Sequence, residues 1–86
     1  MPTSFIQEFM ISVLFLCVEN ACRSQIAEAI CQNLYPHKIL AYSAGSNPAK
    51  KINPKAIQSL SRINITHSGE PKKIDFFEDH TFDYVI

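Results

Sequence analysis

A short apolar run that leads into a polar loop and then into a helical pattern constrains this chain more than any other feature. Residues 11–16 (ISVLFL) are apolar apart from Ser12 and rich in β-branched and aromatic types. Such a run suits a strand that is covered on both faces, as in a parallel sheet. Helical spacing begins near Ser24. The residues between, 17–24 (CVENACRS), are therefore predicted to lie at the carboxyl edge of a sheet and the amino end of a helix, where open α/β folds bind ligands.

The helix after this loop is predicted from the spacing of its apolar residues. Its inner face is expected to comprise Ile26, Ala27, Ile30 and Leu34. Its outer face is expected to carry the polar residues Gln25, Glu28 and Gln32. The dipeptide Tyr35-Pro36 ends the helix, because proline cannot continue it.

The rest of the chain supplies the remaining elements of one α/β domain. They are a strand over 38–43, a helix with Asn53 as N-cap and Pro54 at its first position, a short helical turn over 74–77 and a strand over 82–86. This order predicts a parallel sheet with right-handed crossovers. Residues 1–9 show no clear period and are predicted to be an N-terminal extension of a domain over 10–86. Either Met1 or Met10 could be the start.

The composition of the loop 17–24 is that of an anion-binding site. A helix start offers unpaired N–H groups and about half a positive charge, and successive loop N–H groups can form an anion-binding nest. Arg23 adds a planar guanidinium that can hold two oxygens of a tetrahedral anion. The sequence therefore predicts a site for phosphate, sulfate, arsenate or a similar oxyanion.

Cys17 opens this loop and is predicted to be a nucleophile. Positive surroundings and a helix amino end can lower the pKa of a thiol from about 8.5 to roughly 3.5–7.5. The thiolate could then attack phosphorus or arsenic held in the loop, while the loop N–H groups and Arg23 stabilise the equatorial oxygens. Asn20 suits a left-handed backbone conformation. Ser24 could donate a hydrogen bond to the thiolate, act as the helix N-cap, or do both.

The other cysteines and the histidines are less informative. Cys22 is equally compatible with a small loop residue and with a redox role, and Cys31 is expected in the core. A buried structural cysteine is the alternative for Cys17, although a strand end is an unusual place for one. No metal site is predicted, because no metal-ligand spacing links the cysteines to the histidines His37, His67 and His80.

Charge and cysteine usage restrict the partners and the compartment. Eight basic and eight acidic residues give a net charge of zero, so neither nucleic acid nor a membrane is predicted as partner. The apolar run over 9–18 is about half as long as a membrane span, and no Lys or Arg precedes it as in a signal peptide. Three cysteines, an odd number without a secretory signal, favour a reducing compartment. The predicted location is the cytoplasm.

The segment VLFLCVENACRSQIAEA resembles the amino-terminal signature of the low-molecular-weight protein tyrosine phosphatase superfamily, and within it the thioredoxin-coupled arsenate reductases. The segments YSAGSNP, INPKAIQSL and FDYVI resemble later parts of the same family, so the resemblance covers about residues 11–86. It implies the family's three-layer fold around a parallel sheet. It also implies catalytic roles for Cys17 as nucleophile, Arg23 as oxyanion clamp and Ser24 as thiolate-stabilising group. The substrate-binding residues that it implies are Val18, Glu19, Asn20, Ala21, Cys22 and Arg23.

Several implied features have no counterpart in the printed sequence. The family continues with a last strand and helix, an Asp-Pro loop that carries the general acid and, in the reductases, two relay cysteines. This sequence has no Asp-Pro dipeptide and no cysteine after Cys31, so we expect a C-terminally truncated domain with weak or no turnover. By resemblance, Cys22 can pair with the nucleophile under oxidation. A potassium site of some reductases is matched by Asn20, Glu28 and Ser43, but Lys73 takes the place of its acidic partner, so the ion is not predicted.

Three functions remain in competition at this point. The first is an arsenate reductase-like protein that needs a thioredoxin or glutaredoxin-type reductant and no other cofactor, and Glu19 and the helix segment QIAEA favour it. The second is a phosphatase for phosphotyrosine or small phosphoesters. Such an enzyme would need aromatic walls beside the loop, and Tyr42 is the only nearby candidate. The third is a truncated remnant that is inactive or that only binds an oxyanion.

Overall fold

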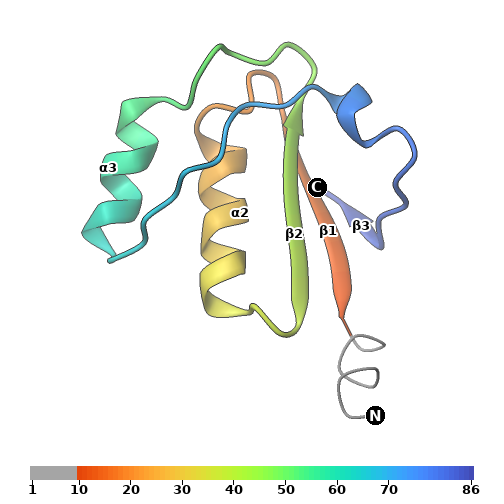
Figure 1. Cartoon of the computed structure of the whole chain (residues 1–86), viewed down its shortest axis with the longest axis horizontal. Helices are drawn as coiled ribbons and strands as arrows, with labels where there is room; N and C mark the ends of the chain where they lie inside the picture. The colour runs from red at the N-terminus through yellow and green to blue at the C-terminus, as the bar shows by residue number, and fades with distance from the viewer. Residues whose placement is uncertain (1–9) are drawn as a thin grey trace.

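The computed structural model describes residues 10–86, and the predicted extension over 1–9 lies outside the described residues. The elements are β1 (Ile11–Cys17), α2 (Arg23–Leu34), β2 (Ile39–Gly45), α3 (Pro54–Arg62), the 3-10 turn η1 (Ile74–Phe77) and β3 (Tyr84–Val85) (Figure 1). The predicted order of elements is confirmed. Within residues 10–86, no helix has the length and apolar character needed to cross a membrane.

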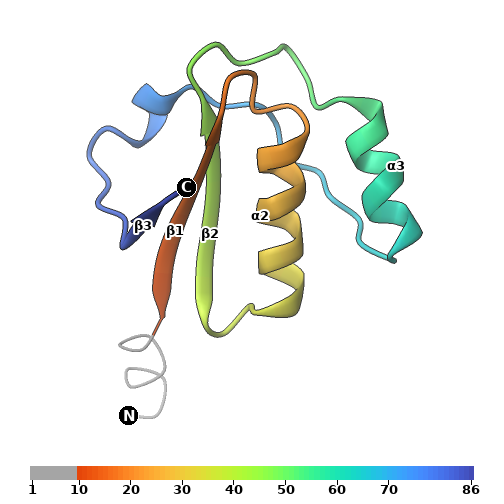
Figure 2. The ribbon, with the colours of Figure 1, turned by 180° about the vertical axis from the view of Figure 1, so that it is seen from behind.

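The three strands form a parallel sheet in the order β2-β1-β3 (Figure 2). The last residue of β1, Cys17, pairs with Gly45 at the end of β2. Asp83 fixes the start of β3, because its carboxylate accepts from the main-chain N–H of Ser12 at 2.8 Å and from the Ser12 hydroxyl at 3.1 Å. The central strand β1 therefore ends at the carboxyl edge of the sheet, and the loop 17–24 begins there.

Different layers cover the two faces of this sheet. On one face α2 packs against β1 and β2, and α3 packs outside α2 (Figures 1 and 2). The core between these helices contains Ala29, Leu60 and Ile65. On the other face the cover is η1 with its neighbouring loop, and the cluster there consists of Leu14, Ala44 and Phe77 with Tyr42 and Phe82 packed against it. The predicted α/β fold with a parallel sheet is confirmed.

The predicted faces of α2 are wrong in three places. Gln25 and Glu28, predicted on the outer face, are 0% and 6% exposed, whereas Leu34, predicted inside, is 63% exposed. The polar side chains are buried because each has a partner: the Ser43 hydroxyl donates to Glu28 Oε1 at 2.7 Å, and Gln25 binds the loop after β1. Burial of a hydrogen-bonded polar group carries little of the usual penalty.

The start of α3 is confirmed. Asn53 Oδ1 accepts from the Lys55 N–H at 2.9 Å, and Pro54 occupies the first turn. Ala56 and Leu60 form the buried face of this helix. The segment that leads to it from β2, residues 46–53, passes over the loop 17–24 and shapes the site described next.

Candidate active site

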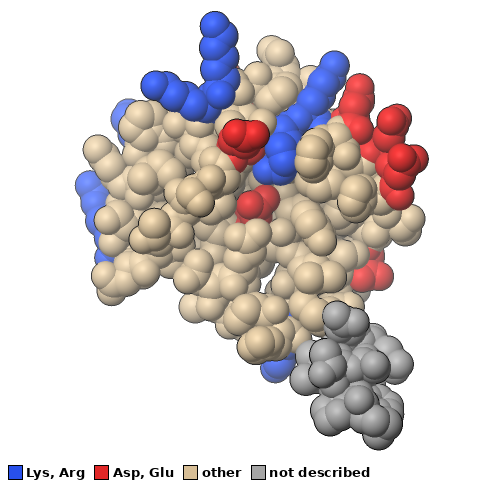
Figure 3. Space-filling view, in the orientation of Figure 1, with Lys and Arg blue, Asp and Glu red and all other residues tan. Residues whose placement is uncertain are grey.

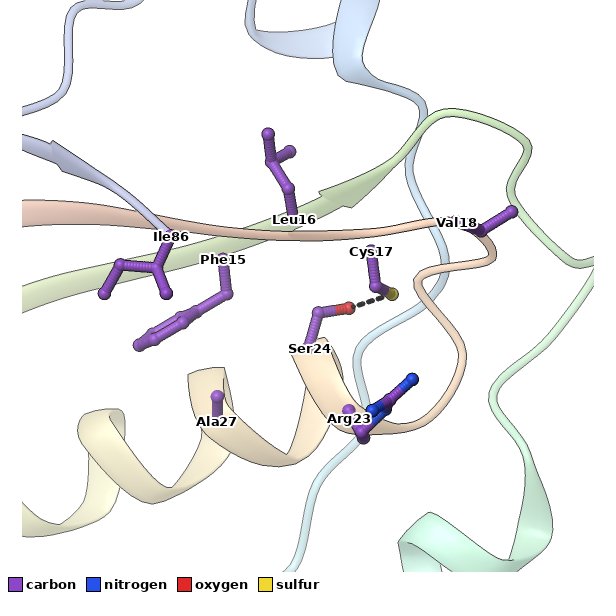
Figure 4. A pocket seen from close by; sticks show the side chains of 8 residues that line it. All are labelled: Phe15, Leu16, Cys17, Val18, Arg23, Ser24, Ala27 and Ile86. Carbon is purple, nitrogen blue, oxygen red and sulfur yellow. Dashed lines mark hydrogen bonds between the residues drawn. The ribbon is translucent and has the colours of Figure 1, made fainter.

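The loop 17–24 bridges the end of β1 and the start of α2, as predicted. A cavity of about 260 Å³ opens on it and is lined by Cys17, Val18, Glu19, Ala21, Cys22, Arg23 and Asn53. A second cavity of about 430 Å³ shares Cys17, Val18 and Arg23 with the first and extends along the apolar side chains of Phe15, Ala27 and Ile86 (Figure 4). Leu16 also lines this cavity, but its side chain points to the other side of β1. Figure 3 shows basic side chains at the same edge of the molecule, with acidic side chains among them.

All the carbonyl groups of residues 17–21 are held from outside the loop. The partners are Ser46 N for Cys17 O (3.2 Å), Asn47 N for Val18 O (2.8 Å), Ala49 N for Glu19 O (2.9 Å), Gln25 Nε2 for Asn20 O (3.1 Å) and Asn53 N for Ala21 O (2.8 Å). In a planar trans peptide the C=O and the next N–H point in opposite directions. The outward carbonyls therefore turn the N–H groups of residues 18–22 toward the concave side of the loop, which is the geometry of an anion nest.

Gly45 lets this loop lie directly on the end of β2. A Cβ built at this position would lie 2.5 Å from Val18 O and 2.9 Å from Asn20 N. Both neighbours are main-chain atoms, which cannot move aside as a flexible side chain could. The close approach of the loop to β2 therefore requires glycine.

Two donors converge on the Cys17 sulfur. Its Sγ lies 2.8 Å from Ser24 Oγ and accepts from the Asn20 N–H at 3.0 Å. The Asn20 amide donates to Ser24 Oγ at 2.8 Å, which leaves the Ser24 proton free to point at the sulfur. Burial raises the pKa of the Cys17 thiol, but hydrogen bonds from the Ser24 hydroxyl and from main-chain N–H groups of the loop outweigh it. The pKa is therefore lowered.

Replacement of Ser24 by alanine is expected to raise the pKa of Cys17, because the thiolate loses its side-chain donor. A rise of about one unit would slow iodoacetamide alkylation of Cys17 about tenfold at a pH below the midpoint. Rates would be followed by mass spectrometry of the Cys17 and Cys31 peptides. Cys31 is the internal control, since burial raises the pKa of its thiol. An unchanged Cys17 midpoint would contradict the prediction.

The same pKa change has a consequence for folding. The pKa of Cys17 is lower in the folded chain than the ordinary pKa of a free thiol. The ionised thiolate therefore favours the folded state above the unfolded pKa. This contribution to the free energy of unfolding is lost as the pH falls through the folded pKa.

Asn20 adopts the predicted left-handed conformation, with φ of 51°, and is fully buried. Its Oδ1 accepts from Lys72 N at 2.7 Å and from Gln25 Nε2 at 3.1 Å. Ser24 has only one of its two predicted roles. The helix starts at Arg23 with Cys22 at the N-cap position and no side-chain cap. Of the alternatives left open for Ser24, the structure therefore shows the hydrogen bond to the sulfur and not the N-cap.

The structure places the remaining predicted residues around the cavity mouth. Arg23 is exposed in the first turn of α2 and lines both cavities (Figure 4). Val18 and Glu19 lie exposed at the rim, and Ala21 is buried in the wall. The thiols of Cys17, Cys22 and Cys31 are all free. Among residues 10–86 no group of three or more His, Cys, Asp or Glu side chains is arranged to hold a metal ion.

Tyr42 does not form a wall of this site. It pairs with Leu14 in the sheet, three residues before Cys17, and its ring packs edge-on against Phe77 and Phe82 with centroids 5.6 and 5.5 Å away. These contacts place the ring in the cluster on the face opposite α2. The residue that the sequence suggested as an aromatic wall is therefore part of the core.

Sequence reasoning missed the residues that hold the loop from behind, which are Gln25, Gly45, His67 and the main chain of residues 46–53 and 72. Gln25 gave no signal of this role, because the apolar spacing of the helix placed it on the outer face. The others act through contacts between segments far apart in the chain.

With this fold and this loop, the chain belongs to the low molecular weight phosphotyrosine protein phosphatase family, whose model matches residues 12–86. It is 38% identical over 63 residues to an arsenate reductase of Bacillus cereus, and this match covers 73% of this chain and 46% of that protein. A glutaredoxin arsenate reductase of Synechocystis is 35% identical over 78 residues, with 90% and 59% covered. A structure described as an arsenate reductase in the phosphate binding state matches with a TM-score of 0.81 and 34% identity, over 88% of this chain and 58% of that one. The chain thus spans about half the length of the curated relatives it matches.

Proposed function

We propose that the loop 17–24 binds arsenate or phosphate and that Cys17 is the nucleophile of an arsenate reductase-like reaction. The observation that carries the proposal is the ring of outward-held carbonyls, which turns successive N–H groups toward the sulfur side of the loop. A bound tetrahedral anion would meet these N–H groups and the amino end of α2. The names of the two relatives and the phosphate-binding state of the structural neighbour favour arsenate and phosphate among the oxyanions.

The chemistry that we propose starts from the thiolate of Cys17. Its attack on bound arsenate forms a sulfur–arsenic bond and breaks one arsenic–oxygen bond, and the oxygen leaves as water after taking up protons. Arg23 and the loop N–H groups stabilise the remaining oxygens, and Ser24 orients the sulfur. A thiol of a thioredoxin or glutaredoxin-type protein then attacks the Cys17 sulfur. Two electrons pass to arsenic, which leaves as arsenite, and Cys17 remains in a mixed disulfide that a second thiol of the reductant resolves.

The phosphatase alternative has less support from the described residues. Tyr42 packs into the core rather than beside the loop. The larger cavity does have an apolar wall, to which Phe15 and Ile86 contribute. Because of this wall, small phosphoesters are a second candidate substrate. The test is whether the native chain hydrolyses para-nitrophenyl phosphate and whether Cys17→Ser loses this activity. A remnant that binds an oxyanion without turnover would give binding and no product in both assays.

The binding step is tested by titrating the native chain with phosphate and with arsenate in a calorimeter. Arg23→Ala is expected to weaken binding at least tenfold, because it removes a charged bidentate donor worth about 1.5–3 kcal/mol. The matched control is Arg62→Ala, which removes an exposed arginine from the last turn of α3 and should leave the affinity unchanged.

Two results would contradict the proposal. One is the absence of any measurable phosphate or arsenate binding by the folded native chain. The other is equal weakening by Arg23→Ala and Arg62→Ala, which would indicate a general effect of net charge rather than a clamp at the loop.

A further inference from the structure

A continuous chain of hydrogen bonds connects the surface histidine His67 to the nucleophile. His67 Nε2 lies 2.7 Å from Gln25 Oε1, and Gln25 Nε2 donates to Asn20 Oδ1 at 3.1 Å. The chain goes on from Asn20 Nδ2 to Ser24 Oγ at 2.8 Å and from Ser24 Oγ to Cys17 Sγ at 2.8 Å. The three middle side chains are buried, two of them with no exposed surface at all.

The direction of this chain follows from its acceptors. The nitrogen of the Gln25 amide faces three oxygens, namely Asn20 O, Asn20 Oδ1 and the main-chain carbonyl of Glu70 at 3.0 Å. A flipped amide would place its own oxygen against all three, so the nitrogen must lie on that side. The Gln25 oxygen then faces His67, and His67 must donate from Nε2.

The protein main chain is shaped to admit this contact. A Cβ at Gly69 would lie 2.9 Å from His67 Nε2 and 3.1 Å from Gln25 Oε1. The absence of a side chain at Gly69 therefore leaves room for the histidine and the glutamine to meet. His67 is half-buried, so the hydrogen bond is partly shielded from water.

We propose that Gln25, anchored by His67, is a positioning residue for the nucleophile loop. Gln25 holds the Asn20 side chain, which orients the Ser24 hydroxyl, and it also holds the Asn20 main-chain carbonyl. The peptide after Asn20 is thereby turned so that the Ala21 N–H faces the concave side of the loop. Lys72 N also donates to Asn20 Oδ1 and so helps to hold the Asn20 side chain. The Asn20 main-chain carbonyl is held by Gln25. The inference rests on the proposed role of Cys17 and adds two residues outside the predicted site.

The test compares three variants with the native chain. His67→Ala removes the anchor and leaves the buried Gln25 oxygen without its donor. His67→Gln keeps an N–H donor in about the place of Nε2. His37→Gln is the matched control, since His37 is exposed beyond the other end of α2. The readouts are the midpoint pH of Cys17 alkylation, the phosphate dissociation constant and the thermal midpoint of unfolding.

We expect His67→Ala to raise the alkylation midpoint by about half a pH unit or more and to weaken phosphate binding about three- to tenfold, as loss of an oriented donor predicts. His67→Gln should retain most of both native values, and His37→Gln all of them. A lower thermal midpoint for His67→Ala with an unchanged alkylation midpoint would overturn the inference, because it would indicate a merely structural role. Failure of His67→Gln to restore the alkylation midpoint would overturn it as well.

A measurement on the native chain covers the case in which His67→Ala does not fold. Nitrogen NMR of the histidine rings should find neutral His67 protonated at Nε2, and a proton at Nδ1 alone would overturn the inference. The two proposals fail separately. A native chain that binds no phosphate contradicts the proposed function, whereas native binding that His67→Ala leaves unchanged contradicts only the role of Gln25 and His67.

Discussion

Replacement of Asn20 by alanine is expected to reduce the free energy of unfolding by about 3–5 kcal/mol and to abolish measurable phosphate binding. The substitution leaves the Lys72 N–H and the Gln25 amide without the Oδ1 acceptor and Ser24 Oγ without its donor. It also puts an alanine at a φ of 51°, where a residue without a local side-chain hydrogen bond is strained. For a chain of this length, such a loss is a large part of the total stability.

Asn64 provides a matched control for this variant. It is the other left-handed asparagine of the described residues, with φ of 62°, and it is exposed. Asn64→Ala should therefore cost only the backbone strain, about 1 kcal/mol. Urea unfolding followed by circular dichroism would measure both variants, and Asn20→Gly would separate strain from lost hydrogen bonds. Full recovery of stability and phosphate binding in Asn20→Gly would contradict the role given to the side chain.

Replacement of Gly45 by alanine is expected to displace the loop. The added methyl would lie 2.5 Å from Val18 O, so the loop must move away from β2. The hydrogen bonds of Ser46 N and Asn47 N to Cys17 O and Val18 O would then lengthen, and the N–H groups behind those carbonyls would lose their alignment. We expect a loss of about 3 kcal/mol in the free energy of unfolding, and at least tenfold weaker phosphate binding through the lost donors.

Ser46→Ala is the control for Gly45→Ala. It changes the neighbouring exposed side chain and keeps the main-chain N–H that binds Cys17 O. Phosphate calorimetry and urea unfolding would be measured on both variants. Native-like phosphate binding by Gly45→Ala would show that the loop does not need its close approach to β2. It would also contradict the role given to the outward-held carbonyls in phosphate binding.

The elements of the fold could be predicted from local signals because each signal acts within a few residues. The apolar run of β1, the spacing of apolar residues in α2 and the Asn53-Pro54 start of α3 all belong to this class. The place of the loop 17–24 between a strand and a helix could be predicted for the same reason. A strand end, a run of short polar residues and a helix start lie next to one another in the sequence. The domain boundary at residue 10 stays a prediction.

The errors concern residues whose environment depends on distant segments. Gln25 has the polarity of a surface residue, and its burial depends on partners 42 and 45 residues away. Leu34 fits the apolar spacing of α2, but it is the last residue of the helix and is exposed there. Ser24 has the chemistry of an N-cap, yet the helix starts one residue earlier and the hydroxyl binds the sulfur. Periodicity describes a helix by itself and cannot include such tertiary partners.

The outward-held carbonyls of the loop also imply a link between the anion and the stability of the whole chain. N–H dipoles that converge on one point repel one another, and a bound anion at that point replaces the repulsion by attraction. The segments that hold the loop in place, residues 46–53 and 72, belong to the framework of the sheet edge. A ligand that binds only the folded loop at a hundred times its dissociation constant would add about 2.7 kcal/mol to the free energy of unfolding. A bound oxyanion would then stabilise the fold of this α/β chain as well as occupy the loop.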